Sequence, residues 1–135
     1  MKRTITTLMI IGIICSLAIP FAASATESIV QPRWSYLDSV YAYLDINWLG
    51  VATCEGSAIA RSSVEIKTVV RLQQLTDTGW STIKSWSDTG TLNASAGGKI
   101  AVARGYDYRV TVSAYVYDDN GNIVETGSSS DSDSY

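Results

Sequence analysis

The sequence predicts an all-β protein, a single antiparallel β-sandwich of about seven strands. From Trp34 onward the apolar residues recur with a period of two rather than 3.6, and β-branched and aromatic residues dominate. Turn-forming residues separate these apolar runs at short intervals, and the chain shows no helical period and no internal repeat. Seven short strands in one chain of this size are typical of a sandwich with one core.

The first two expected strands each have a core face and a solvent face. Within residues 36–48 the even-numbered positions from Val40 to Trp48 are apolar, while Tyr41 and Tyr43 face the other way. Residues 51–60 repeat the alternation with smaller side chains. The positions that we expect in the core of these two runs are Val40, Ala42, Leu44, Ile46, Trp48, Ala52, Cys54, Gly56, Ala58 and Ala60.

The middle of the chain contains two further strong strands and a weak one. Residues 64–75 alternate apolar and charged side chains, and Asp77-Thr78-Gly79 forms a turn into a fourth strand at 79–86. Two consecutive glycines follow at positions 97 and 98, and glycine weakens a strand. The sequence therefore predicts only a weak fifth strand, near residues 99–103.

The segment GYDYRVTVSAYVYDDNGN, residues 105–122, predicts the sixth strand and the turn after it, and residues 123–126 predict a short last strand. A Tyr near the start of the penultimate strand is typical of a tyrosine corner, and either Tyr106 or Tyr108 could supply its hydroxyl. This feature favours an immunoglobulin-like or fibronectin-III-like sandwich. Residues 128–135 contain serines and aspartates but no aliphatic side chain, so we expect a disordered tail.

The first 25 residues have the pattern of a signal peptide with a helical apolar segment. Lys2 and Arg3 precede an apolar run, and small residues at Ala23 and Ala25 predict cleavage between Ala25 and Thr26. The run is shorter than the roughly 20 residues of a membrane-spanning helix, which argues against an anchor. The expected organisation is a signal peptide (1–25), a sandwich (26–127) and a tail (128–135) of a protein that is secreted and leaves the membrane.

Charge and cysteine content restrict the partners. The signal peptide removes two of the ten basic residues and none of the 13 acidic ones, leaving eight bases and a net charge of −5. An acidic chain without a basic stripe argues against nucleic acid as a partner. Cys54 is the one cysteine of the mature chain, so no intramolecular disulfide can form. A buried, inert thiol is favoured over a reactive one that pairs with another chain.

The residue types also argue against catalysis and against a metal or other cofactor. The chain contains no histidine, which removes serine and cysteine catalysis of the Ser-His-Asp kind and the commonest zinc ligand. Carboxylate pairs remain, but the acids are scattered over expected turns and solvent faces. Asp118, Asp119, Asn120 and Asn122 resemble the start of a calcium loop, yet Ile123 and Ser129 replace the required Gly and Glu. Asn120-Gly121 predicts a hairpin turn instead.

The aromatic residues are the better candidates for a binding site. Trp80 and Trp86 share parity in the fourth strand and oppose Ile83, so either both tryptophans or the isoleucine must face solvent. With Tyr41 and Tyr43 they would offer flat rings to a polysaccharide or to the apolar patch of an extracellular protein. The alternative is that one or two tryptophans fill the core. We expect a non-catalytic binding module for carbohydrate or the cell envelope, or else an extracellular interaction or structural component.

Four stretches together suggest a relationship: QPRWSYLDSV, ATCEGSA, VVRLQQ followed by GWSTIKSW, and YDYRVTVSAYVYDDNG. The combination resembles a group of small secreted proteins of Gram-positive bacteria, a domain of unknown function. The resemblance spans residues 29–125 and implies a secreted β-sandwich. It transfers no catalytic or binding residue to this chain.

Overall fold

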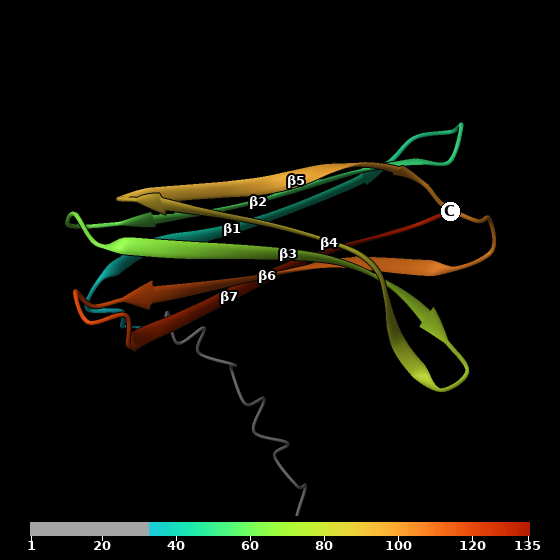
Figure 1. The fold of residues 1–135 in the computed structure, drawn as a ribbon. Coiled ribbons are helices and arrows are strands. Elements are labelled where there is room, and N and C mark those ends of the chain that lie inside the picture. Colours follow the sequence, from blue (N-terminus) through green and yellow to red (C-terminus); the bar gives the residue numbers. More distant parts are fainter. Residues whose placement is uncertain (1–32) are drawn as a thin grey trace, which may run out of the picture. The chain divides into compact units, whose positions relative to one another are not determined.

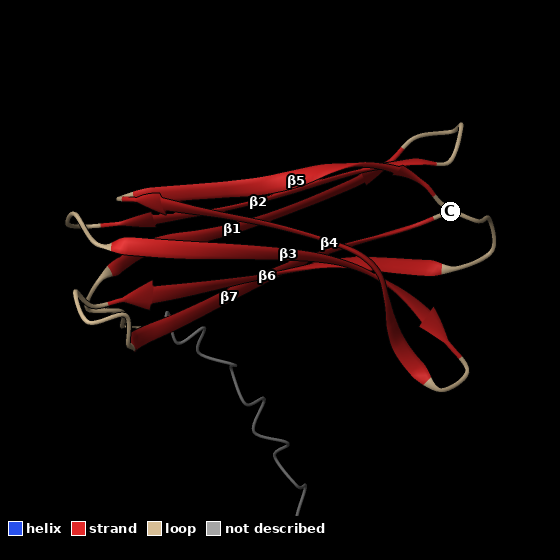
Figure 2. Cartoon of the chain, in the orientation of Figure 1, coloured by secondary structure: helices blue, strands red, loops and turns tan. Residues whose placement is uncertain are grey.

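The computed structural model describes residues 33–135, and this part of the chain contains strands but no helix (Figures 1 and 2). The expected signal peptide, its cleavage site at Ala25 and Thr26, and the expected start of the sandwich at residue 26 lie outside the described residues. The strands are β1 (Leu37–Ile46), β2 (Val51–Ala60), β3 (Glu65–Thr76), β4 (Gly79–Thr91), β5 (Asn93–Ala101), β6 (Asp107–Tyr117) and β7 (Ile123–Ser134).

The seven strands form two sheets, and every paired neighbour is antiparallel. One sheet has three strands in the order β1-β2-β5, and the other has four in the order β4-β3-β6-β7. Figure 1 shows the two sheets as layers, with β5, β2 and β1 in one and β3, β6 and β7 in the other. The prediction of an all-β fold of two antiparallel sheets is confirmed. No helix within residues 33–135 is long and apolar enough to cross a membrane.

The core lies between the sheets and follows the period of two that the sequence predicts. Strand β6 buries every second side chain, and β2 and β3 do the same. Thr68 is fully buried in this core, and its hydroxyl donates to the Ala94 carbonyl oxygen at 3.1 Å. Because Thr68 belongs to β3 and Ala94 to β5, this hydrogen bond joins the two sheets.

Several of the expected strands have different bounds, and β4, for example, continues to Thr91 rather than to residue 86. Strand β1 ends at Ile46, so Trp48 lies in the following turn and not in the core. The alternation of apolar residues continues to residue 48 in the sequence, but the strand itself stops two residues earlier. The fifth strand spans Asn93–Ala101 rather than residues 99–103. Its small residues pair in register with β2 from Ile59 to Val51, and this pairing needs backbone groups rather than large side chains.

The predicted tyrosine hydroxyl contact is present at Tyr108. This side chain is buried, and its hydroxyl donates to the Ala103 carbonyl oxygen at 2.6 Å. The bond fixes the loop between β5 and β6 to the start of β6. Tyr106, the other candidate, is exposed and contacts the Tyr108 ring edge to face.

The prediction of a disordered tail is wrong, because residues 128–134 belong to β7. This strand pairs with β6 along its length, from Tyr117 opposite Ile123 to Asp107 opposite Ser134. The low apolar content favoured disorder, but a ladder of backbone hydrogen bonds does not depend on apolar side chains. The serines at even positions face solvent, and the odd positions face β1.

Carboxylates of β7 close one side of the sandwich. Asp131 accepts a hydrogen bond from the Leu44 amide and Asp133 from the Ile46 amide, each at 2.8 Å. These N–H groups lie on the free edge of β1, where no strand of its own sheet pairs with them. Three acidic side chains of β7 bond to backbone amides in and just before β1, and we call this the carboxylate seam: Glu125, Asp131 and Asp133.

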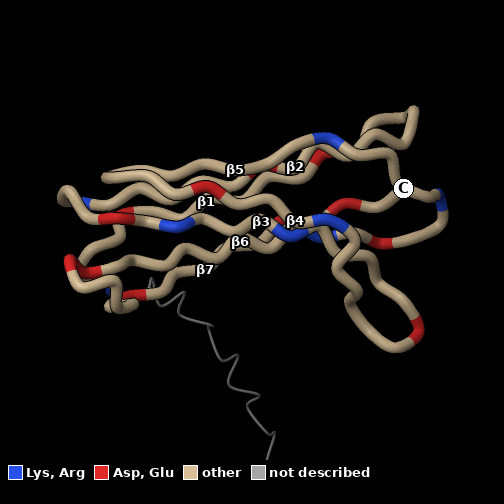
Figure 3. The backbone as a smooth tube through the Cα atoms, in the orientation of Figure 1, with Lys and Arg blue, Asp and Glu red and all other residues tan. Residues whose placement is uncertain are grey.

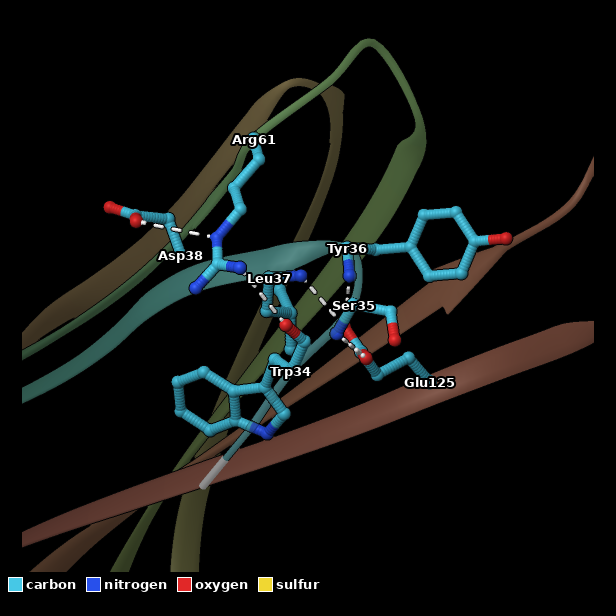
Figure 4. Close-up of polar contacts among 7 residues, drawn as sticks. All are labelled: Trp34, Ser35, Tyr36, Leu37, Asp38, Arg61 and Glu125. Carbon is cyan, nitrogen blue, oxygen red and sulfur yellow. Dashed lines mark hydrogen bonds and ion pairs between the residues drawn. The ribbon is translucent and has the colours of Figure 1, made fainter. Parts of the chain in front are cut away.

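Glu125 makes the densest contact of the carboxylate seam (Figure 4). Its two carboxylate oxygens accept hydrogen bonds from the amides of Ser35 at 2.6 Å, Tyr36 at 3.0 Å and Leu37 at 2.7 Å. Burial works to raise the pKa of this carboxyl, but the three amides and the nearby Arg61 charge outweigh it, so the pKa lies below its ordinary value. Glu125 is therefore ionised at neutral pH.

Candidate functional site

The outer face of the three-stranded sheet carries an open depression of about 600 Å³. A volume of this size is in the usual range for a small-molecule or sugar site. Three rows of paired residues cross the sheet here, and each row takes one residue from β1, β2 and β5 in turn. The rows are Tyr41, Ser57 and Ser95; Tyr43, Glu55 and Gly97; and Asp45, Thr53 and Lys99.

Two consecutive glycines of β5 lie at this depression, Gly97 on its outer face and Gly98 on the side that faces the core. Gly97 has a φ of +153°, and a Cβ at this position would lie 2.1 Å from the Cys54 carbonyl oxygen. A Cβ on Gly98 would lie 2.6 Å from the Trp86 indole nitrogen. Neither position can take a side chain without movement of its neighbours. The glycine pair, which the sequence suggested as a sign of a weak strand, instead permits close packing and leaves an open floor.

Tyr41 lines this depression on the side formed by β1, and Tyr43 lies in the next row, opposite the lining residue Glu55. Their side chains are 55% and 37% exposed, and they are two residues apart on the same face, about 7 Å along the strand. The Asp45 carboxylate, together with lost hydration and the Glu55 carboxylate, raises the pKa of the Tyr43 hydroxyl. The hydroxyl is therefore protonated at neutral pH and can donate a hydrogen bond.

The groups around the depression can contact a ligand in several ways. The rings of Tyr41 and Tyr43 can stack on an apolar ligand face, and the hydroxyls of Ser57 and Ser95 can donate and accept hydrogen bonds. Lys99 offers a positive charge at one end. Within residues 33–135 no three His, Cys, Asp or Glu side chains gather as a metal site would require.

Trp80 does not belong to this site. A β-bulge in β4 leaves Ile83 unpaired, because Leu72 pairs with Lys84 and Gln73 with Thr82. One extra residue reverses which side chains face outward. Trp80 therefore faces solvent on the four-stranded sheet, where the Arg109 guanidinium lies 4.3 Å from its ring centre.

Trp86 lies on the other side of the bulge and faces inward. It pairs with the buried Val70 and packs against the core, with its indole beneath Gly98 of β5. The expectation that the two tryptophans share a face is therefore wrong, and the alternative that one tryptophan fills the core holds for Trp86. Of the four predicted aromatic residues, only Tyr41 and Tyr43 come together.

Sequence reasoning missed the most exposed aromatic side chain of the described chain. Trp48 is 82% exposed and Leu49 62% exposed in the turn between β1 and β2. The Asn47 side-chain oxygen accepts hydrogen bonds from the amides of Leu49 and Val51, both at 3.0 Å, which holds the turn. Asn47 and Gly50 flank the pair, and such turn-forming residues could have predicted a loop here.

The acidic cluster after β6 forms the turn that the sequence predicts. One carboxylate oxygen of Asp118 accepts hydrogen bonds from the amides of Asn120 and Asn122, both at 2.9 Å. Gly121 has a φ of +81°, as the turn requires. The hydrogen bond from the Asn122 amide is the largest cause that lowers the pKa of Asp118, although some burial opposes it. The Asp118 carboxylate therefore stabilises the turn to which it belongs.

Cys54 points into the core, as predicted. It is fully buried, and burial raises the pKa of its thiol to about 11. At neutral pH almost no thiolate forms, and the thiolate is the reactive species. The side chain acts as a small apolar residue.

No protein-family model matches this sequence, and no curated protein matches it either.

Proposed function

We propose that this protein is a secreted, non-catalytic binding module that binds polysaccharide of the cell envelope or its surroundings through Tyr41 and Tyr43. The observation that carries the proposal is the open depression beside these two tyrosines, floored by glycine and serine. Rigid rings next to a polar floor fit a sugar, which has an apolar ring face and a rim of hydroxyls. The rigid sheet holds both rings in place before the ligand arrives, which lowers the entropic cost of binding.

The fold supports a more specific type for this module, the fibronectin-III-like sandwich. The fourth strand pairs with the third and not with the fifth, which gives sheets of three and four strands. The Tyr108 hydroxyl contact with Ala103 supports the same type, because tyrosine corners occur in this class of sandwich. The resemblance to small secreted proteins of Gram-positive bacteria and the expected signal peptide belong to the proposal, and they supply the extracellular location.

The test is co-sedimentation of the purified protein with insoluble polysaccharides and isolated cell walls. We expect saturable binding, and we expect Tyr41→Ala with Tyr43→Ala to reduce affinity at least tenfold, since ring contacts contribute about 1–3 kcal/mol each to comparable sites. Tyr106→Ala is the matched control, because Tyr106 is equally exposed but lies before β6. Absence of binding to every polysaccharide and wall preparation would refute the proposal.

One observation favours a protein partner as the second candidate. Trp48 and Leu49 present a large apolar surface on a turn that the Asn47 side chain stabilises. Aromatic anchors of this kind are common at protein interfaces. Tyr135 supports this turn, since its hydroxyl donates to the Trp48 carbonyl oxygen at 3.2 Å. If Trp48→Ala abolishes capture of an extracellular protein while polysaccharides fail to bind, the role is that of an extracellular interaction component.

A further inference from the structure

Hydroxyl and basic side chains occupy most of the central outward positions of the four-stranded sheet. Each of its strands alternates between the core and solvent, so the outward residues of the four strands line up in rows across the sheet. One row contains Arg71 and the next contains Val69. The hydroxyl residues of these two rows, from β4, β6 and β7, are Ser85, Ser87, Thr111, Ser113, Ser128 and Ser130.

Three basic side chains run along the middle of this face. Lys67 and Arg71 share β3, about 13 Å apart at 3.3 Å per residue. Arg109 lies on the adjacent β6, where it is fixed by a 2.7 Å hydrogen bond from its Nε to the Gln73 side-chain oxygen. It also stacks on the Trp80 ring. One cation is therefore held in place before any ligand binds.

These basic groups have no carboxylate partner within the described chain. The single ion pair in residues 33–135 joins Arg61 to Asp38, away from this face. Among the outward positions of the four strands, acids occur only near the two ends, at Glu65 and Asp107. Figure 3 marks basic positions along the middle of these strands. In a chain with a net charge of −3, a face with three cations and no acid between them is complementary to an anionic ligand.

The hydroxyl rows favour a polyol chain as that ligand. A serine or threonine hydroxyl can both donate and accept a hydrogen bond, which matches the hydroxyls of a sugar chain. Single-stranded nucleic acid, by contrast, needs several exposed rings for base stacking, and the rows of Arg71 and Val69 contain none. Of the rings in neighbouring rows, Trp80 is stacked on Arg109 and Tyr115 is half-buried. Duplex DNA binders neutralise more phosphates than three cations can.

We propose that the outer face of the four-stranded sheet binds an anionic polysaccharide, through Lys67, Arg71 and Arg109 for its acidic groups and the serine and threonine rows for its hydroxyls. Uronate and phosphate groups present the same anionic oxygens to these cations. The site lies on the opposite sheet from Tyr41 and Tyr43, so it is independent of the function proposed above.

The experiment measures binding of the purified protein to polygalacturonate, to a poly(glycerol phosphate) and to neutral dextran at about 50 mM salt. We expect binding to at least one anionic polymer and none to dextran through this face. Lys67→Gln combined with Arg71→Gln should weaken that binding about tenfold, since each cation near an anionic surface contributes a factor of roughly three to five. Lys67→Gln alone, at an exposed position, provides the same test if the double variant folds poorly.

Lys84→Gln is the matched control, because Lys84 is exposed and pairs with the buried Leu72, on the side of β4 away from the hydroxyl rows, and this change removes the same charge. A loss as large in Lys84→Gln as in the Lys67 variant would overturn the proposal, since it would show attraction to net charge alone. Failure to bind either anionic polymer would also overturn it, as would equal affinity for single-stranded DNA of the same charge. A difference between polygalacturonate and poly(glycerol phosphate) identifies the acidic group of the ligand. Loss of binding to a neutral polysaccharide in the variant with Tyr41→Ala and Tyr43→Ala would test the tyrosine site on the other sheet, so the two proposals can fail independently.

Discussion

The interior of the sandwich and the carboxylate seam hold the same two sheets together by different means. The interior contains apolar side chains that alternate along the strands, with no ionised group. The carboxylate seam contains Glu125, Asp131 and Asp133, whose carboxylates accept hydrogen bonds from backbone amides of β1 or of the residues just before it. The difference shows how the described part of the chain, in which Cys54 is free and buried, holds a sandwich together without a disulfide.

The two regions should respond differently to conditions. Burial of apolar surface contributes about 25 cal/mol per Å² and does not depend on the ionisation of any side chain. Charge-assisted hydrogen bonds contribute more than neutral ones but require the carboxylates to be ionised. We therefore expect interior variants to lose stability at every pH and seam variants to lose it only where carboxylates are charged.

The largest effect should come from the interior, with Trp86→Ala. This change removes an indole that packs against the core and beneath Gly98, and it leaves a cavity. We expect a loss of about 3 kcal/mol in the free energy of unfolding, the lower end for truncation of a buried aromatic because Trp86 is partly exposed. Urea denaturation followed by circular dichroism measures it.

Trp80→Ala is the control for this prediction, since it removes the same side chain from the solvent face of the same strand. It should cost about 1 kcal/mol or less, mainly the lost contact with Arg109. Equal losses for the two variants would contradict two features of the structure, the interior position of Trp86 and the β-bulge at Ile83.

The next effect should come from the carboxylate seam, with Glu125→Gln. The amide keeps one acceptor oxygen and loses the charge, while three backbone amides still need acceptors. We expect a loss of about 2 kcal/mol at pH 7, measured by urea denaturation, because hydrogen bonds to a charged group are worth about 1.5–3 kcal/mol. Glu65→Gln, at an exposed position of β3, should change stability by less than about 0.5 kcal/mol.

The interior was largely predictable from the sequence, and the carboxylate seam was not. Alternation in residues such as Val110, Val112 and Ala114 depends on neighbours two positions away, so a single sequence reveals it. The contact between Glu125 and the Leu37 amide joins residues 88 positions apart, and no local pattern encodes it. The same limit applies to the bulge that separates Trp80 from Trp86, because one unpaired residue in β4 depends on its partner strand. Composition likewise could not reveal that the serine-rich residues 128–134 pair with β6.

Acid should reduce the difference between wild type and Glu125→Gln. The folded-state pKa of Glu125 lies below its ordinary value of about 4.3, so its contribution is fully present above that value and is lost as pH falls through the folded-state pKa. The two proteins should therefore differ by about 2 kcal/mol at pH 7 and converge toward pH 2. Urea denaturation at a series of pH values measures this. A constant difference across the series would show that the charge of Glu125 does not matter.

The smallest effect should come from Asp131→Asn and Asp133→Asn, at about 0.5–1 kcal/mol each, because one amide donor is concerned in each case and the Asn oxygen can still accept it. Hydrogen exchange of backbone amides detects such a change better than denaturation does, since it reports local opening.

Asp131→Asn should speed exchange of the Leu44 amide, and Asp133→Asn that of the Ile46 amide. The amides of Tyr43 and Asp45 provide the control within the same strand, because in an antiparallel pair alternate residues bond to β2 and these two point away from the seam. If all four amides exchange faster together, then β1 opens as a unit, and the carboxylates of β7 stabilise the whole strand rather than single donors.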